Sequence, residues 1–139
     1  MTDRQEFFSA KLQYETDPSD VYAAQKAAAP IVIVDVRSDE AWAQGRIAGA
    51  VHMHYSEIAV RAPAEIPQDA EVVVYCWSPG CNAGAKGALE FAKLGYAVRE
   101  MIGGFEYWVR EGYPITDHDG VHRRPIDPLT GVPRVRTRS

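Results

Sequence analysis

The feature that most constrains the fold is a short apolar run, residues 72–75, that ends at Cys76 and is followed by a loop and a helical pattern. Val-Val-Val-Tyr is β-branched and apolar throughout, which is typical of a strand buried on both faces. Apolar residues at 85, 88, 89 and 92 recur at helical spacing, and Gly95 provides a left-handed stop. The sequence therefore predicts that Cys76 lies where a buried strand ends, just before a helix begins.

This position favours an anion at the Cys76 sulfur. The first turn of a helix has N–H groups without partners and carries partial positive charge. A thiol there is expected to have a pKa below the free value of about 8.5. We therefore expect Cys76 to be a nucleophile that can hold a thiolate or a persulfide. The alternative is an inert buried cysteine at a strand end.

Strand and helix patterns alternate along the rest of the chain, which predicts a parallel α/β sheet with right-handed crossovers. Ligands of such sheets bind beyond the carboxyl ends of the strands, where Cys76 is expected. Residues 11–15 form a short alternating segment, and residues 63–67 are expected to be a linker. The other predicted strands are 31–34, 45–53 and 97–101, and the predicted helices are 3–10, 17–29, 38–44, 56–60, 83–94 and 105–110.

Several short motifs make the chain resemble a single rhodanese-like (sulfurtransferase) domain. The motifs are Asp35-Val36-Arg37, Gly45-Arg46-Ile47-Ala48-Gly49-Ala50, Tyr75-Cys76, Gly103-Gly104-Phe105-Glu106-Tyr107-Trp108 and Gly112-Tyr113-Pro114. The resemblance covers residues 12–115 and implies an α/β fold with a five-stranded parallel sheet flanked by helices on both faces. We expect residues 1–116 to form this single domain. It also implies that Cys76 takes a sulfane sulfur from thiosulfate, a persulfide or a polysulfide and passes it to a thiol or cyanide. Neither a metal nor an organic cofactor is implied.

The resemblance assigns the anion-binding loop to the residues after Cys76, and this loop departs from the family pattern. Family loops commonly close with a basic or hydroxyl residue, as in Cys-x4-Arg, whereas the residue here is Cys81. Phosphatases and arsenate reductases of related architecture use Cys-x5-Arg, and that position holds Asn82. Because the loop has no Lys or Arg, we expect weak activity with thiosulfate and a preference for less charged persulfide or polysulfide donors. The loop residues are Trp77, Ser78, Pro79, Gly80, Cys81 and Asn82.

Five other residues are candidates for a role beside Cys76, and most of them have two interpretations. Cys81 is either a resolving thiol that attacks a persulfide on Cys76 or a small residue that fills the corner before the helix. Trp77 either forms the mouth of the pocket and selects the acceptor or packs on the surface, and Ser78 is a candidate hydrogen-bond donor to a bound anion. Asp35 and Arg37 are supporting residues for which a structural ion pair is favoured over chemistry.

The remaining features exclude several other classes. His52 and His54, like His118 and His122, lack a third ligand at a recognisable spacing, so no metal site is expected. The chain has no apolar stretch long enough for a membrane span and no secretory pattern near its start. Two cysteines five positions apart do not form a disulfide framework, so we expect a cytoplasmic protein.

The last residues, 117–139, are rich in Pro and Arg and are expected to form an extended arm. Five arginines and one aspartate give residues 121–139 a net charge of +4, which leaves −8 on residues 1–120. We therefore favour an arm that lies on the acidic body of its own or a neighbouring subunit over one that binds nucleic acid. The arm is thus a candidate contact for a homo-oligomer, through Arg134, Arg136 and Arg138.

Two classes of function remain open. The first is a sulfurtransferase that uses Cys76 as its nucleophile. The second is a non-catalytic rhodanese-like module that binds a partner or senses redox state through Cys76 and Cys81.

Overall fold

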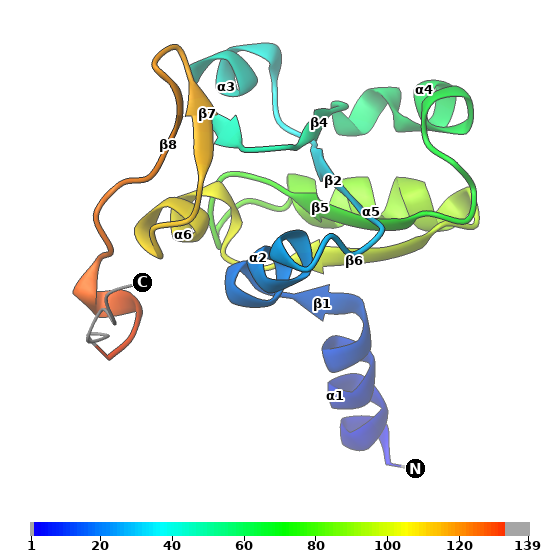
Figure 1. Ribbon diagram of the computed structural model, residues 1–139. Helices are drawn as coiled ribbons and strands as arrows, with labels where there is room; N and C mark the ends of the chain where they lie inside the picture. The colour runs from blue at the N-terminus through cyan, green and yellow to red at the C-terminus, as the bar shows by residue number, and fades with distance from the viewer. Residues whose placement is uncertain (1, 133–139) are drawn as a thin grey trace.

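A computed structural model of the chain describes residues 2–132; Arg134, Arg136 and Arg138 lie outside the described residues. Five parallel strands form the main sheet, in the order β1-β6-β5-β2-β4 (Figure 1). The strands are β1 (Glu15–Thr16), β2 (Ile31–Asp35), β4 (Val51–His52), β5 (Glu71–Tyr75) and β6 (Ala97–Met101). The run that ends at Cys76 is therefore the middle strand of the sheet.

Helices cover both faces of this sheet, which confirms the predicted fold class. Ile58 and Phe91 of α4 (Ile58–Glu65) and α5 (Ala83–Lys93) pack in the core on one face. Val21 and Trp108 of α2 (Pro18–Lys26) and α6 (Gly104–Arg110) pack in the core on the other. Because side chains alternate along a strand, Val74 faces the first core, while Val73 and Tyr75 face the second.

Two helices begin as their capping residues predict. The Asp17 carboxylate accepts a hydrogen bond from the Asp20 N–H, and Pro18 is the first residue of α2. Ser38 accepts from the Ala41 N–H and caps α3 (Asp39–Gln44), which Gly45 ends. These caps fix the directions in which the chain leaves β1 and β2.

The interpretation of residues 45–53 as one strand was wrong, and residues 117–122 belong to a hairpin rather than to an extended arm. For the rest of residues 117–139 the arm stays a prediction. The first segment divides into β3 (Arg46–Ile47) and β4, which lie in different sheets. β3 pairs antiparallel with β7 (Ile115–Asp117), which forms a hairpin with β8 (Gly120–His122). The hairpin turns at His118 and Asp119, and Gly120, which begins β8, has a φ of +93°. The residues of β7 and β8 have no strand pattern in their own sequence, and they form strands because β7 pairs with β3.

Residues 63–67 are not a linker. Pro63 lies inside α4, which follows the short 3-10 helix η1 (Tyr55–Glu57). Ile58, Ala62 and Ile66 are buried against the sheet, and this burial compensates for the hydrogen bond that a proline removes. The final short helix, η2 (Pro128–Thr130), ends the described part of the chain.

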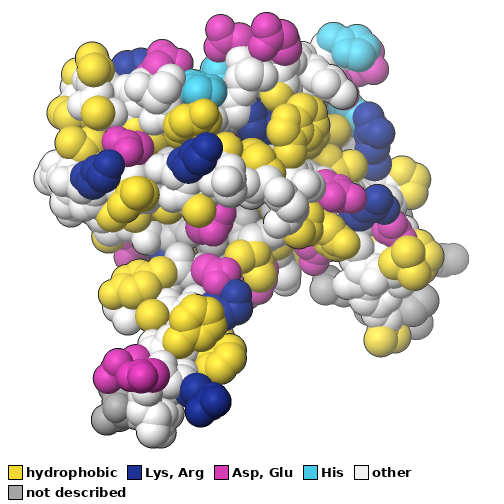
Figure 2. Space-filling view, turned by 180° about the vertical axis from the view of Figure 1, so that it is seen from behind, with side chains coloured by type: hydrophobic (Ala, Val, Ile, Leu, Met, Phe, Trp, Pro, Cys, Tyr) yellow, Lys and Arg dark blue, Asp and Glu magenta, His cyan; other side chains and the backbone are white. Residues whose placement is uncertain are grey.

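The first helix, α1 (Asp3–Tyr14), is longer than expected and projects from the body (Figures 1 and 2). Thr2 and Gln5 form a capping box at its start. The helix has no buried residue, and Phe7, Phe8, Leu12 and Tyr14 are exposed along it. In residues 2–132, no helix combines the length and the apolar character that crossing a bilayer requires.

Candidate active site

Cys76 follows directly after β5, and its side chain is buried on the face of the sheet that α4 and α5 cover. The chain then forms the loop 76–82 and enters α5 at Ala83. Asn82 is the N-cap of α5, and its side chain makes no capping hydrogen bond. The first-turn amides of α5 are therefore not satisfied by the cap, and they can interact with a group bound near Cys76.

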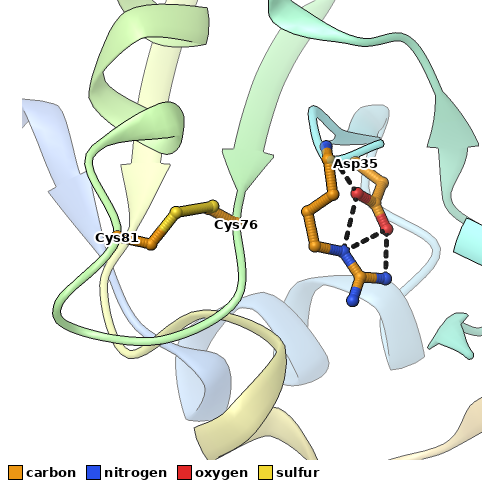
Figure 3. Close-up of a disulfide and its surroundings, with 4 residues drawn as sticks. Asp35, Cys76 and Cys81 are labelled. Carbon is orange, nitrogen blue, oxygen red and sulfur yellow. Dashed lines mark hydrogen bonds and ion pairs between the residues drawn. A yellow bond between two sulfur atoms is a disulfide. The ribbon is translucent and has the colours of Figure 1, made fainter. Parts of the chain in front are cut away.

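The loop brings Cys81 back beside Cys76. The Cys81 N–H donates to the Ser78 carbonyl oxygen at 3.1 Å, which closes a turn. The two Cα atoms lie 6.4 Å apart, and the two sulfurs are joined in a disulfide (Figure 3). This Cα separation is within the range that disulfides require. The structure thus represents an oxidised form in which neither sulfur is a free thiol.

The beginning of α6 holds the loop in place. The Phe105 N–H donates to the Cys76 carbonyl oxygen and the Glu106 N–H to the Trp77 carbonyl oxygen, both at 2.8 Å. Gly104 lies against the same stretch of backbone with a φ of +67°. Glycine fits here because it has no Cβ atom and tolerates a positive φ. The Gly103-Gly104 pair thus lets α6 approach the loop closely.

A cavity of about 330 Å³ opens beside the two sulfurs. Of the predicted loop residues, Trp77 and Gly80 are absent from its wall. Among the described residues, the wall contains no Lys or Arg. It consists of Glu15, Cys76, Ser78, Pro79, Cys81, Asn82, Ala85, Glu100, Met101, Ile102, Gly103 and Gly104.

Two carboxylates, Glu15 and Glu100, are the charged wall residues that sequence reasoning missed. Burial raises the pKa of Glu100, and the neighbouring Glu15 carboxylate raises it further. A sequence signal for Glu100 did exist. It lies near the carboxyl end of a predicted strand, and these ends share one edge of a parallel sheet with Cys76.

Asp35, the last residue of β2, forms a buried ion pair with Arg37 (Figure 3). Arg37 Nε is 3.0 Å and 3.1 Å from the two carboxylate oxygens of Asp35, and Nη2 is 2.7 Å from Oδ2. The Tyr75 hydroxyl donates to Asp35 Oδ2 at 2.6 Å and accepts from the Ile47 N–H at 3.1 Å. Neither Asp35 nor Arg37 lines the cavity beside Cys76, and their contacts are those of a structural network.

Arg37 also supports Trp77. Its guanidinium carbon is 4.4 Å from the centre of the Trp77 ring and 4.6 Å from that of Phe105. Nη1 of Arg37 is buried and has no hydrogen-bond partner in the described part of the chain. The two aromatic faces compensate this charge in part. Trp77 and Phe105 line a separate cavity of about 710 Å³, so the Trp77 side chain lies beside the loop rather than over Cys76.

The four histidines lie in two places: His52 and His54 near the end of β4, and His118 and His122 beside Asp117, whose Oδ2 is 2.7 Å from His122 Nε2. His54 lies beyond the end of β4, and its Nδ1 is 2.7 Å from the Ser56 hydroxyl. His52 stacks on Trp42. The ligand atoms of Asp117, His118 and Asp119 lie within 4.8 Å of one another at the tip of the β7–β8 hairpin. These side chains are mostly exposed, and acidic groups gather in this way on many surfaces without an ion.

The chain matches a protein family, several known proteins and many solved structures. The family model of the rhodanese-like domain matches residues 17–111. A sulfurtransferase of Allochromatium vinosum is 36% identical over 94 residues, which are 65% of this chain and 82% of that protein. The thiosulfate sulfurtransferase GlpE of Pseudomonas paraeruginosa is 33% identical over 90 residues, 63% of this chain and 77% of the relative. A crystal structure of a Bacillus halodurans protein has a TM-score of 0.78 at 34% identity and covers 85% of this chain and 87% of that one.

Proposed function

The chain belongs to the rhodanese-like domain family, and we propose on this basis that it is a sulfurtransferase in which Cys76 carries the sulfur. The reduced Cys76 thiolate attacks the outer sulfur of the donor, and the rest of the donor leaves with the electron pair of the broken S–S bond, as a thiolate from a persulfide or as sulfite from thiosulfate. Cys76 then holds a persulfide. An acceptor thiolate or cyanide attacks the outer sulfur of this persulfide, and the Cys76 thiolate leaves.

The observation that carries the proposal is the position of Cys76. It lines a cavity at the carboxyl end of the middle strand, next to the uncapped first turn of α5. Helix N-termini lower the pKa of nearby thiols and stabilise anions, which supports both the attacking thiolate and the bound persulfide. A nucleophile aligned with such dipoles is a recurring arrangement for covalent transfer.

The cavity wall favours persulfide or polysulfide donors over thiosulfate. Thiosulfate is a dianion. Among the described residues, the cavity wall contains two carboxylates, which repel a dianion, and no cationic side chain that would attract it. Steady-state rates with thiosulfate and with an organic persulfide test this preference. A clear preference for thiosulfate would contradict it.

Cys81 is proposed to resolve the persulfide. Its thiolate attacks Cys76 Sγ, the bond between the two persulfide sulfurs breaks, and hydrosulfide leaves. The product is the Cys76–Cys81 disulfide, the bond that joins these residues in the structure. An external dithiol then reduces this bond and is itself oxidised to a disulfide. The 6.4 Å Cα separation supports this step because the loop needs no rearrangement to allow it.

Mass spectrometry tests the sulfurtransferase proposal directly. The reduced Cys81→Ser variant, which cannot resolve the persulfide, should gain the mass of one sulfur atom after treatment with an organic persulfide, located on the peptide that contains Cys76. The gain should be lost when Cys76→Ser is added to this variant. If no donor adds sulfur to reduced Cys81→Ser, the proposal is wrong.

The disulfide favours a second candidate function, that of a redox-sensing module. In this case the Cys76–Cys81 pair would switch between dithiol and disulfide without carrying sulfur. The two candidates predict different results in the same measurement. A module that only senses redox state would form the disulfide with an oxidant but would gain no sulfur from a persulfide.

A further inference from the structure

Three neighbouring strands direct side chains toward the Cys76 cavity. Glu15 of β1 is the register partner of Glu100 of β6, which is in turn the partner of Val74 of β5. Register partners in parallel strands point to the same face of a sheet, and so do residues two apart on one strand. Glu15 and Glu100 therefore share the face of Val74 and of Cys76, and both line the cavity beside the disulfide.

The charges of the two carboxylates differ in how they are compensated. Lys11 Nζ lies 2.6 Å from Glu15 Oε1, so the charge of Glu15 is paired. The Glu100 carboxylate makes no hydrogen bond or ion pair with any residue in the 2–132 range. An unpaired, half-buried carboxylate is costly unless a ligand supplies the missing partner.

The Glu100 carboxylate lies over the beginning of α5. A Cβ atom added to Gly84, the second residue of α5, would lie 2.6 Å from Glu100 Oε2. The first turn of α5 is also where the dipole of the helix would stabilise an anionic donor. The protein's own carboxylate therefore competes with any anion for this position, while a cation in the cavity would gain a partner.

We propose that Glu100 selects the sulfur donor by charge, so that the Cys76 cavity takes small persulfides that carry an ammonium group and rejects anionic ones. The inference rests on the proposed sulfur transfer and deepens it. The ammonium group binds the free Glu100 carboxylate, and this contact places the sulfane sulfur beside Cys76. A sulfonate or carboxylate on the donor is repelled by the same group. At about 330 Å³, the cavity suits a donor of a few heavy atoms.

The test compares two donors of equal length and opposite charge, the persulfides of aminoethanethiol and of sulfanylethanesulfonate. For each, kcat/KM is measured for sulfur transfer by the reduced protein and by Glu100→Gln, and the ratio of the two values is calculated. Because intrinsic donor reactivity is the same for both proteins, it cancels when the ratios are compared. We expect the ratio, cationic over anionic, to be about tenfold higher in the unmodified protein.

Glu71→Gln is the matched control. It removes the same charge from an exposed position at the opposite end of the sheet, where β5 begins. This variant should keep the ratio of the unmodified protein. If both variants lost the preference for the cationic donor equally, the preference would be an effect of net charge, and the role of Glu100 would be overturned.

A second measurement uses the unmodified protein alone. The ratio of kcat/KM for the cationic donor to that for the anionic donor should fall as the pH drops through the range where Glu100 gains a proton. A neutral carboxyl group no longer attracts an ammonium group. The sulfonate stays ionised throughout, and Glu15 and Lys11 are the charged groups that face Glu100. A ratio that does not respond to pH or to Glu100→Gln overturns the inference. Such a result leaves sulfur transfer intact, because that proposal fails when neither donor adds sulfur to Cys76.

Discussion

A Cβ atom at Gly104 would lie 2.8 Å from the Cys76 carbonyl oxygen, and equally close to the Ser78 nitrogen and the Trp77 carbonyl carbon. The first residue of α6 is therefore in direct backbone contact with the loop that carries the proposed nucleophile. The shape of this loop therefore depends on the position of α6. That position is fixed in turn by Trp108 of α6, which is buried in the core on one face of the sheet.

Gly104→Ala should destabilise the protein by about 2–4 kcal/mol, because it adds strain at a positive φ to a clash with backbone atoms. Denaturant unfolding followed by circular dichroism measures the change. Gly80→Ala is the matched control in the same loop, since a Cβ there meets only Ser78 Oγ, at 4.0 Å. Equal stability of the two variants would contradict the close contact.

Tyr75→Phe should reduce the free energy of unfolding by about 1–3 kcal/mol. The variant removes the hydroxyl that donates to Asp35 and leaves the Ile47 N–H without its acceptor. Chemical denaturation of the two proteins at the same pH checks this prediction. A change of a few tenths of a kcal/mol would show that the network is not important for stability.

Arg37→Ala should reduce the free energy of unfolding by about 3–5 kcal/mol, because it leaves the buried Asp35 carboxylate without its cation. In the double variant Asp35→Ala, Arg37→Ala, the loss of unfolding free energy should be smaller than the sum of the losses in the two single variants, since no unpaired charge remains. A double-mutant cycle of unfolding free energies measures this coupling. Additive effects would argue against the pair.

Cys81→Ser should retain persulfide on Cys76 and release less hydrosulfide in the absence of an acceptor. The serine hydroxyl cannot displace hydrosulfide from the Cys76 persulfide. Persulfide lifetime by mass spectrometry and hydrosulfide release by a colorimetric assay check the two parts. Unchanged release would eliminate the resolving role of Cys81.

The stability of the protein should depend on pH through Glu100. Burial and Glu15 raise the pKa of Glu100 above its ordinary value of 4.5 in the folded protein. The folded state therefore binds this proton more tightly than the unfolded state does. The resulting stabilisation is complete below the unfolded pKa and is lost as the pH rises through the folded pKa.

Glu100→Gln does not titrate and should escape this loss. Its unfolding free energy, relative to that of the unmodified protein, should therefore increase between about pH 4 and pH 7. Thermal or urea unfolding across that range measures the difference. A constant difference would show that folding leaves the pKa of Glu100 unchanged.

The sequence predicted the middle strand because residues 72–75 are apolar and bounded by a clear loop and helix signal. Pro63 misled the interpretation, since a proline usually ends a helix, yet buried Ile58 and Ala62 keep α4 continuous through it. The hairpin of β7 and β8 was missed because its stability comes from pairing with β3, a contact distant in sequence.

The site shows the same division between local and non-local information. The position of Cys76 can be predicted from the strand and helix patterns on either side of it. The lack of a cation in the loop can be read directly from the loop sequence. The proximity of Glu15 depends on β1 pairing with β6, far along the sequence. A two-residue strand such as β1 has too short a pattern to be predicted from its own residues.

The disulfide between Cys76 and Cys81 also affects how the protein is handled. While the bond is intact, Cys76 has no thiolate with which to attack a sulfur donor, so the proposed transfer needs the bond to be reduced first. The proposed activity would then depend on the ambient thiol–disulfide balance, and assays that omit a reductant would not detect it.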